Sequence, residues 1–399
     1  MEEYVTDKDL NIGEKENEHS SPNNLKKNMT GINKARKRLC YISYETFYHA
    51  DKPVLPLLAT EYEVVYCLIE PGDSLIDEEE LSAFSKKSGI TSIRFHHKAR
   101  RRNIKQLYYY LRLLRKVLSV KPDINFFVAE YNIYFSLLAP FFLSTKNTVI
   151  AFHDVLPHKK ATNILKDLSV SLLKSHFKKF HFFSETQMKY FESRYKSKKC
   201  SFTPLILTHY GQPLSKAIPK TKKVRFLFFG GIKYYKGIDV LLKACEELYA
   251  EGISDFTVTI AGDGDYWEEC KGIIKAPALY NLEKRFIDDS EIPKLFSEAD
   301  FLILPYRDVT QSGPLAIAHH YNVPAIASNH AGFIEHIEHG YNGYIFKNED
   351  VSDLKNIMLQ IILQPDEEYL KLKDNLENYT KNKYSLKEIL KGYKASFEG

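Results

Sequence analysis

Short apolar runs alternate with amphipathic segments from residue 38 onward. Such runs, rich in aromatic and β-branched residues, predict strands buried on both faces, and apolar residues three or four apart predict helices. The alternation favours an α/β fold with parallel, doubly wound sheets. In the first half we expect strands at Leu39–Ser43, Glu63–Ile69, Ser92–Phe95, Ile124–Ala129, Thr148–Phe152 and Phe180–Phe183.

The second half repeats this pattern after a segment rich in proline and lysine. We expect strands at 224–229, 256–260, 301–304 and 324–327, and helices at 238–250, 265–275, 291–298, 314–321, 351–363, 366–382 and 385–397. The two halves predict Rossmann-like domains that face each other across a cleft, with ligands at the carboxyl ends of the strands. The predicted parts are a disordered polar tail (1–37), the first domain (38–212), a linker (213–223), the second domain (224–382) and a C-terminal helix that is a candidate to pack back on the first domain (383–399).

Composition narrows the class of protein. A net charge of +5 over 399 residues gives no overall nucleic-acid signature. The five cysteines are scattered without a CxxC pair, which favours reduced thiols in a cytosolic protein over a zinc site. The N-terminus is polar and acidic, so we expect no signal peptide, and the longest apolar run, Tyr131–Leu143, is shorter than a membrane span. We expect a cytoplasmic protein, with peripheral attachment to the inner face of the plasma membrane left open.

A glycine-lysine turn follows the strand 224–229. In VRFLFFGGIKYYKGIDVLL, Gly230 and Gly231 end the strand, and Lys233 and Lys236 precede a helix. Backbone N–H groups and ammonium groups in such a turn suit an anion, most simply a phosphate. An ordinary strand-to-helix turn that carries lysines explains the local pattern equally well.

Two more turns end on the same predicted edge. The strand 256–260 runs into AGDGD, which contains Gly262, and the strand 301–304 runs into a loop with TQSG, residues 310–313. In that loop Gln311, Ser312 and Gly313 come immediately before a helix with proline at its first position, and the positive end of the helix dipole suits a phosphate. If Ser312 only caps the helix, that role accounts for the sequence of this turn. It does not account for three such turns at the same edge of the sheet.

The first half offers two further candidates. His153 and Asp154 end the strand 148–152, where they either orient an acceptor hydroxyl or form a structural pair. The segment 98–118 predicts a basic amphipathic helix with an apolar face at Ile104, Leu107, Tyr108, Leu111, Leu114 and Leu118. Its cations suit an anionic membrane or acceptor, although packing on the sheet with a solvated basic face is an equal alternative. The membrane or acceptor candidates are Arg101, Arg102, Lys105 and Arg112.

The second half resembles a known family over roughly 140 residues. The matching residues are FFGGIKYYKGIDVLLKA, TIAGDGD, FIDDSEIPKLFSEADFLILPY and SGPLAIAHHYNVPAIASNHAGFIEHIEHGYNGYIF. They resemble the donor-binding domain of the retaining glycosyltransferases of family four, which have the GT-B fold. The resemblance implies that Gly230 and Lys236 hold the donor diphosphate, with Gly231 beside them, and that Phe286 and Ile287 lie against the nucleotide base.

This chain departs from the family pattern at three positions. An arginine of the family is Gly231 here, and Lys233 is the candidate that supplies its charge. The paired glutamates of the family fall on Val309 and Ile317, which cannot bind a hydroxyl. Some members with a Ser-Gly in this region also lack the pair and use the Ser-Gly against the phosphates, and TQSG fits that subset.

The resemblance implies a transferase that moves a sugar from a nucleoside-diphosphate sugar, UDP- or GDP-linked, to a hydroxyl with retention. A lipid-linked saccharide in surface polysaccharide synthesis is an acceptor candidate. His153 and Asp154 are the candidates on the acceptor side, and Lys236 is the candidate that stabilises the departing diphosphate. Glu335 either lies near the donor or is an exposed helix glutamate. No metal or cofactor is expected, and the acidic residues at 263–265 and 288–289 are interpreted as solvated turns.

The sequence leaves two other functions to consider. The missing glutamates motivate an inactive nucleotide-sugar-binding subunit that serves a partner transferase. A nicotinamide-dependent oxidoreductase is disfavoured because no G-x-G-x-x-G follows the first strand of either half.

Overall fold

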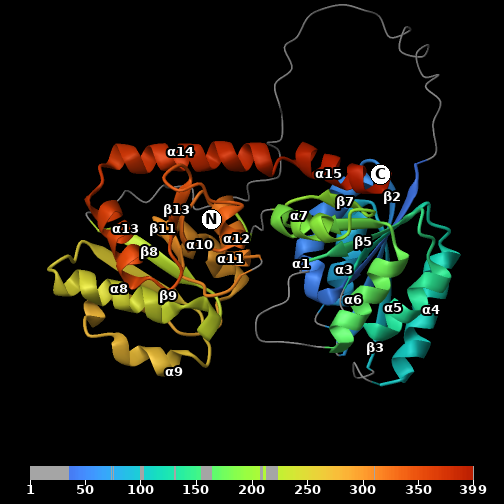
Figure 1. The fold of residues 1–399 in the computed structure, drawn as a ribbon, viewed down its shortest axis with the longest axis horizontal. Coiled ribbons are helices and arrows are strands. Elements are labelled where there is room, and N and C mark those ends of the chain that lie inside the picture. The colour runs from blue at the N-terminus through green and yellow to red at the C-terminus, as the bar shows by residue number, and fades with distance from the viewer. Residues whose placement is uncertain are drawn as a thin grey trace, which may run out of the picture. The chain divides into compact units, whose positions relative to one another are not determined.

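The computed structural model describes residues 36–72, 74, 76–98, 103–129, 132–153, 164–206, 210–212, 223–309 and 311–398. Most of the predicted tail and linker, together with Asp154, Arg101, Arg102 and Thr310, lies outside these residues. Residues 37–399 form one compact unit (Figure 1). Within the described residues, no helix has the length and apolar character needed to cross a bilayer.

The first sheet has seven parallel strands in the order β3-β2-β1-β4-β5-β6-β7. Its central strands are buried on both faces, as their apolar runs require. The strands are β1 (Arg38–Tyr44), β2 (Glu63–Pro71), β3 (Thr91–His97), β4 (Ile124–Val128), β5 (Thr148–Phe152), β6 (Lys179–Phe182) and β7 (Lys199–Phe202).

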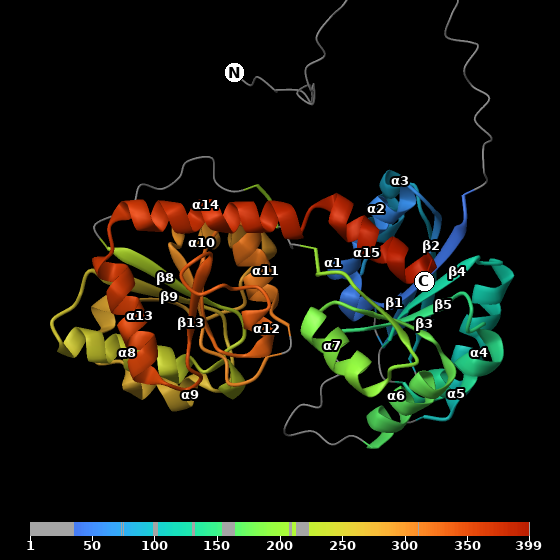
Figure 2. The same ribbon diagram turned by 45° about the horizontal axis from the view of Figure 1, so that its top comes forward.

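Helices cover both faces of this sheet. One core lies beneath α4, α5, α6 and α7, and the other beneath α1, α2, α3 and the last helix of the chain (Figures 1 and 2). These helices are α1 (Tyr48–Asp51), α2 (Val54–Ala59), α3 (Glu78–Ser88), α4 (Lys105–Ser119), α5 (Ile133–Phe142), α6 (Ile164–His176) and α7 (Glu185–Arg194).

The second sheet has six parallel strands in the order β10-β9-β8-β11-β12-β13. One core lies between this sheet and α8, α9, α13 and α14, and the other beneath α10, α11 and α12. The strands are β8 (Val224–Phe229), β9 (Phe256–Ala261), β10 (Tyr280–Glu283), β11 (Phe301–Leu304), β12 (Ala325–Ser328) and β13 (Gly343–Phe346). The helices are α8 (Ile238–Ala250), α9 (Trp267–Cys270), α10 (Ile292–Glu298), α11 (Gly313–His320), α12 (Ala331–Ile334), α13 (Val351–Leu363) and α14 (Asp366–Lys383).

The last helix, α15 (Leu386–Glu398), contributes to the core of the first sheet. Ile389, Tyr393 and Phe397 are buried there, and the Tyr393 ring stacks on His181 with ring centroids 5.0 Å apart. Figure 2 shows the chain leaving the second sheet along α14 and reaching the first through α15. The core between the first sheet and α1, α2, α3 and α15 therefore contains residues from both ends of the described chain.

The α/β fold with two doubly wound parallel sheets is confirmed. The predicted helix at 265–275 is wrong in length: α9 ends at Cys270 and a 3-10 turn follows at Lys271–Ile273. Gly272 in that turn lowers helix propensity and explains the early end. Three strands were missed, namely β7, β10 and β13, and all three are sheet edges.

Candidate functional site

The glycine turn after β8 has a backbone that requires glycine. Gly230 and Gly237 have φ angles of +105° and +63°, a region that side chains disfavour. A Cβ at Gly237 would lie 1.9 Å from the carbonyl oxygen of Pro305, which follows β11. Gly231 differs, because the nearest atom to a Cβ there is 3.8 Å away. The turn is thus pressed against the end of the neighbouring strand, whereas a Cβ at Gly231 would meet only an ordinary van der Waals contact.

The turn after β9 packs directly on the turn after β8. A Cβ at Gly262, whose φ is +142°, would lie 2.2 Å from the carbonyl oxygen of Gly230, and one at Gly264 would lie 2.1 Å from that of Ile232. Backbone hydrogen bonds join Gly230 N–H to Ala261 and Ile232 N–H to Asp263. The packing of the two turns therefore requires glycine at position 262, independently of the contact with the donor that is predicted for Gly262.

Lys236 is the cation buried in this site. Its side chain is nearly buried, and its Nζ lies 2.8 Å from the position that a Cβ on Gly230 would take. The ammonium also lies 5.2 Å from the centre of the Tyr306 ring. Burial lowers the pKa of Lys236 to about 8, and among the described residues no carboxylate pairs with it. A buried cation without an anion is suited to a ligand that brings negative charge.

Lys233 lies in a different environment. Its side chain is exposed, and its Nζ lies 3.0 Å from a carboxylate oxygen of Asp265. The Asp265 charge already compensates this lysine. The structure therefore gives Lys236, rather than Lys233, the character of an anion-binding residue, and the role predicted for Lys233 stays a prediction.

Arg307, which the sequence analysis missed, holds the lysine turn in place. Its guanidinium donates two hydrogen bonds of 2.9 and 2.8 Å to the Asp239 carboxylate of α8, and a third of 2.8 Å to the Tyr234 carbonyl. Its backbone N–H bonds to the Tyr235 carbonyl at 2.7 Å. These contacts link the turn to α8 and to the loop after β11. An arginine shortly after a buried strand was the only signal for it in the sequence.

The first turn of α11 completes the anion site. Ser312 caps the helix by accepting a hydrogen bond of 3.3 Å from Leu315 N–H, and Pro314 follows in the first turn. Pro314 Cγ lies 3.8 Å from the position that a Cβ on Gly230 would take. The glycine turn, the Lys236 ammonium and the positive end of the α11 dipole therefore converge, as the sequence predicted for these turns.

His153 meets this site from the end of β5. Its ring stacks between Phe47 and Phe183, with ring centroids 4.1 and 4.2 Å away. Burial between these rings lowers the pKa of His153 to about 4, and the side chain of Gln311 opposes that shift only in part. The imidazole is therefore neutral at physiological pH. A cavity of about 30 Å³ is lined in part by Phe183, which stacks on His153, and by Gln311 and Ser312.

The nitrogen of the Gln311 side chain has no hydrogen-bond partner within the described part of the chain. It is a buried donor at the point where the ends of β5 and α11 approach each other, and a buried donor of this kind favours a ligand oxygen. Gln311 is thus a better supported candidate than its sequence context alone indicated.

Glu335 is committed to a contact between the two sheets. Its carboxylate accepts hydrogen bonds from the Ser184 hydroxyl at 2.7 Å, from Glu185 N–H at 2.8 Å and from Thr186 N–H at 3.2 Å. These groups form the N-terminus of α7, where an anion is favourable. Its side chain is only 4% exposed, which rules out the alternative of an exposed helix glutamate. In this arrangement the carboxylate caps α7, and its role toward a donor stays a prediction.

The two residues predicted to contact the nucleotide base differ in their exposure. Ile287 is buried in the core beneath α10 and α11, while the Phe286 side chain is 81% exposed. Of the two, Phe286 alone is accessible from solvent, and its contact with a base stays a prediction. Ile317 is buried in the same core and Val309 packs against it, so neither glutamate position of the family carries a charged group facing the site.

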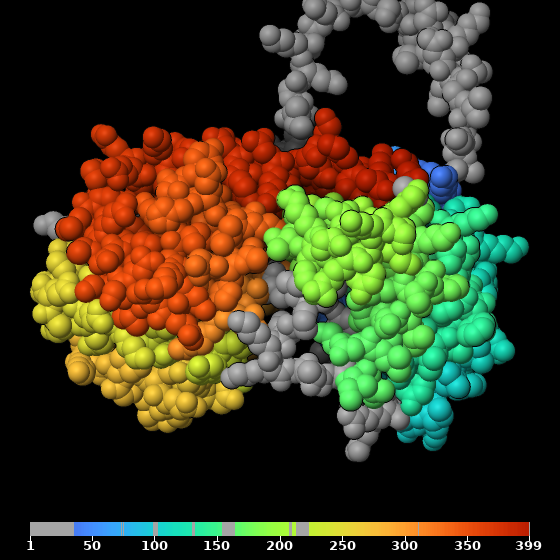
Figure 3. All heavy atoms as spheres, viewed as in Figure 1, coloured from blue at the N-terminus to red at the C-terminus, as the bar shows by residue number. Residues whose placement is uncertain are grey.

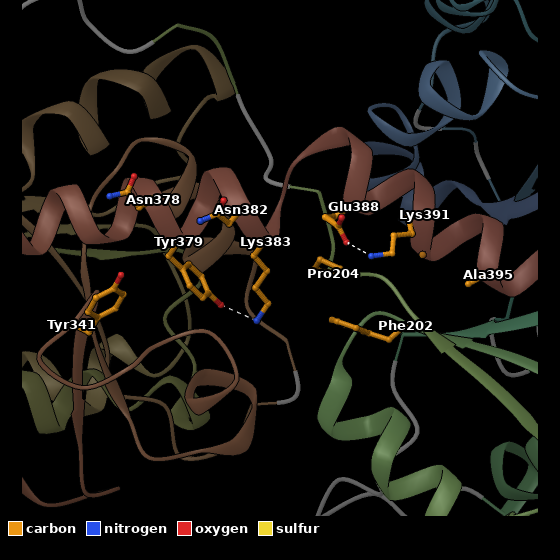
Figure 4. A pocket seen from close by; sticks show the side chains of 11 residues that line it. Phe202, Pro204, Tyr341, Asn378, Tyr379, Asn382, Lys383, Glu388, Lys391 and Ala395 are labelled. Carbon is orange, nitrogen blue, oxygen red and sulfur yellow. Dashed lines mark hydrogen bonds and ion pairs between the residues drawn. The ribbon is translucent and has the colours of Figure 1, made fainter.

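A cavity of about 660 Å³ lies elsewhere, under the junction of α14 and α15 (Figure 4). Its charged side chains are already paired: Lys391 donates to Glu388 at 3.1 Å, and Lys383 donates to the Tyr379 hydroxyl at 2.7 Å. None of the glycine turns lines it. We therefore place the candidate site at the turns. The described residues also contain no group of three or more His, Cys, Asp or Glu able to hold a metal ion.

The helix α4 packs with a different face from the predicted one. Gln106, Tyr110, Leu113, Leu114 and Val117 are buried. Of the six apolar residues predicted to form one face, Leu114 alone belongs to this buried set, and most of the others are exposed. Lys105 and Arg112 are exposed as well. The predicted apolar face is therefore mostly exposed, because Gln106 and Tyr110 take packing positions on a neighbouring face of the helix.

The folds of solved glycosyltransferases match this architecture along nearly the whole chain. Anabaena HepE, solved with UDP and glucose, superposes with a TM-score of 0.68 at 16% identity, covering 91% of this chain and 100% of that one. A glycosyltransferase of Rickettsia africae gives a TM-score of 0.70 at 16% identity, covering 91% and 98%. These likenesses show that the chain has the GT-B fold.

Residues 223–364 match the family model described as Glycosyl transferases group 1. A 41.2 kDa protein in the cps region of Klebsiella pneumoniae is 32% identical over 139 residues, 34% of this chain and 36% of that protein. The amylovoran biosynthesis glycosyltransferase AmsK of Erwinia amylovora is 31% identical over 146 residues, 35% of this chain and 36% of its own length. The aligned segment thus spans little more than a third of each of these relatives.

Proposed function

We propose that this protein is a glycosyltransferase that moves a sugar from a nucleoside-diphosphate sugar to a hydroxyl group. The observation that carries the proposal is the convergence of Gly230, the Lys236 ammonium and the first turn of α11. The group that departs from such a donor is a diphosphate. A buried cation and a helix N-terminus in one place would stabilise the charge that develops on it.

We propose UDP- or GDP-linked sugars as donors and retention as the stereochemical outcome. The complex of Anabaena HepE with UDP and glucose supports a UDP-linked donor, and the resemblance of the second half to the retaining glycosyltransferases of family four supports retention. Phe286 has an exposed ring beside the second sheet and is the candidate to stack on the base. We infer that Lys236 and the α11 terminus neutralise the diphosphate without a metal ion.

On the acceptor side, the proposed residue is His153. Because its pKa is lowered to about 4, the ring is uncharged at neutral pH and is able to accept a hydrogen bond from a hydroxyl. It would orient an acceptor rather than supply positive charge. The cps-region protein and the amylovoran transferase support a saccharide acceptor in polysaccharide synthesis, and a lipid-linked saccharide is the specific proposal.

An alternative is a protein that binds a nucleotide sugar without turning it over. The observation behind it is that Ile317 and Val309 occupy the positions of the family's paired glutamates and pack in or against the core. This alternative retains the diphosphate site and loses the transfer step, so the two proposals differ in turnover and agree in binding.

Calorimetric titration of the full chain with UDP and GDP tests the binding step. Replacing Lys236 by alanine should weaken nucleotide affinity by more than about tenfold, the loss of one charge-assisted contact. Lys233→Ala is the matched control, because that lysine is exposed and paired with Asp265, and it should change affinity by less than about threefold. Equal losses in the two variants would refute the assignment of Lys236.

Release of the free nucleotide from UDP- and GDP-sugars, with and without oligosaccharide acceptors, then separates the alternatives. Turnover that depends on His153 supports a transferase. Tight nucleotide binding with no turnover of any donor supports the binding protein, and the absence of nucleotide binding would overturn both.

A further inference from the structure

The three helices α4, α5 and α6 carry the exposed apolar side chains of the first half of the chain. Of the nineteen large apolar residues that are exposed in the described parts, nine lie on these helices or at the N-cap of α4. Between residues 36 and 206, no other described element exposes one. Scattered exposed apolar residues are normal in proteins, but a concentration on neighbouring helices marks a contact surface.

On α4 these residues form a stripe along the helix. Ile104, Leu107, Tyr108 and Leu118 are between 36% and 69% exposed, and the first three are spaced as neighbours on one helical face. The opposite side of α4 is buried against the sheet. The helix therefore has two apolar sides, and only one of them has a partner in the described chain.

The stripe continues onto the adjoining helices. On α5, Leu137 and Phe141 lie one turn apart and are 46% and 85% exposed. At the start of α6, Ile164, Leu165 and Leu168 are between 41% and 81% exposed. The helices α4 and α5 pack together, as do α5 and α6, and Figures 1 and 2 show all three on the same side of the first sheet. We call this set of residues the α4–α6 surface.

The charges around this surface are mostly positive, and the exposed Asp167 of α6 is the exception on the three helices. The exposed residues of α4 include Lys105, Arg112, Arg115 and Lys116, and neither α4 nor α5 contains an acidic residue. The Arg112 guanidinium lies 5.8 Å from the Tyr108 ring, so cation and aromatic ring share the surface. Figure 3 shows α4 (cyan) and α6 (green) as part of the outer surface of this side.

We propose that the α4–α6 surface docks the protein on an anionic lipid membrane. Exposed apolar side chains enter the boundary between head groups and acyl chains, and the surrounding cations attract anionic head groups. A second copy of the chain is a poorer occupant, because a symmetric contact would bring the same cations together. The proposal does not depend on the proposed transferase activity.

Docking in this way orients the rest of the molecule. In a parallel sheet the helix that follows a strand begins at the strand's carboxyl end, so α4 and α6 start at the edge of the sheet where His153 lies. The first turns of both helices carry apolar residues of the surface. A docked protein therefore brings this edge close to the head groups.

Vesicle sedimentation with the full chain tests the proposal. The unmutated protein should bind vesicles of phosphatidylcholine containing roughly one third phosphatidylglycerol, and about 0.5 M NaCl should release it, because salt screens the attraction between exposed charges. The triple variant Ile104→Ser, Phe141→Ser and Ile164→Ser should partition at least tenfold less. The charge variant Lys105→Glu, Arg112→Glu and Lys116→Glu should lose binding to a similar extent.

The control replaces three exposed leucines of the second half, Leu282, Leu363 and Leu370, by serine and should bind vesicles like the unmutated protein. The thermal unfolding midpoint of each variant separates loss of docking from loss of folding. No vesicle binding by the unmutated protein, or an equal loss in the control variant, would overturn the proposal. So would a dimer in solution that the surface variants convert to a monomer, since a second copy would then occupy the surface.

Discussion

The buried ammonium of Lys236 should make the protein less stable than it would be without that charge. Burial lowers the pKa of this lysine from 10.5 to about 8. One pKa unit corresponds to about 1.4 kcal/mol, so holding the charged lysine in the folded state costs about 3 kcal/mol at neutral pH. The Lys236→Met variant keeps the length of the side chain, removes the charge and loses a contact with Tyr306 worth roughly 1 kcal/mol. We expect a net gain in the free energy of unfolding of about 2 kcal/mol.

The sign of this effect depends on pH. Because the folded-state pKa is lowered, the cost is complete below about pH 8 and disappears as the pH rises through 8 toward 10.5. Lys236→Met should therefore melt about 4 to 8 °C above the unmutated protein at pH 7, on the scale of roughly 2 to 4 °C per kcal/mol for a domain of this size. The difference should shrink to nearly zero by about pH 10.

Thermal unfolding of both proteins across this pH range measures the difference in stability. Titration with UDP tests whether the charge that destabilises the fold is needed to bind the nucleotide. The stabilised variant should bind UDP more than about tenfold more weakly. Lys233→Met, at an exposed and ion-paired lysine, should show neither change. A lower melting temperature for Lys236→Met at pH 7, or a difference that does not vary with pH, would refute a buried, uncompensated cation.

Three further perturbations have defined outcomes. Arg307→Lys cannot reproduce the paired hydrogen bonds to Asp239, so it should lower the free energy of unfolding by about 1 to 3 kcal/mol. It should also weaken UDP binding, because the lysine turn loosens. An unchanged melting temperature and UDP affinity would contradict this. Gly262→Ala should cost at least about 2 kcal/mol because its Cβ would lie 2.2 Å from a carbonyl oxygen at a φ of +142°, whereas Gly272→Ala, with nothing within 4 Å, should be nearly neutral in the same denaturation experiment. Burial lowers the pKa of His181 and of His319 to about 3, so moving from pH 7 to pH 5 should cost about 2 kcal/mol for each. The pKa of Asp51, raised by burial to about 7, works in the opposite direction, and Asp51→Asn should therefore steepen the loss of stability measured by urea titration at the two pH values.

The sequence predicted those elements whose residues are buried on both faces. The strand 224–229 and the helix 238–250 coincide with β8 and α8, because an uninterrupted apolar run and a helical repeat leave little ambiguity. The missed strands β7, β10 and β13 lie at sheet edges, where one side has no neighbouring strand and polar residues are tolerated. Their sequences, KCSF, YNLE and GYIF, are too short or too polar to predict a buried strand.

The candidate site was predictable only as far as its turns. The glycines and the lysines are local features, and their positions at strand ends follow from the parallel topology. The distinction between Lys233 and Lys236 depends on Asp265, which is 32 residues away from its partner in the chain. The use of Glu335 as a cap for α7 joins groups about 150 residues apart. Contacts of this kind arise from tertiary packing, and no local pattern indicates them.

The position of α15 has a consequence for how the chain folds during its synthesis. The first sheet is complete in sequence at Phe202, but its core also needs Ile389, Tyr393 and Phe397. At about 5 to 20 residues per second, a ribosome adds the intervening residues in roughly 10 to 40 s. Throughout that interval the domain made first has an unfinished core with exposed apolar surface, while the domain made second is able to fold. We therefore expect the nascent chain to need chaperone protection until its last helix emerges, and the order of domain completion to be the reverse of the order of translation.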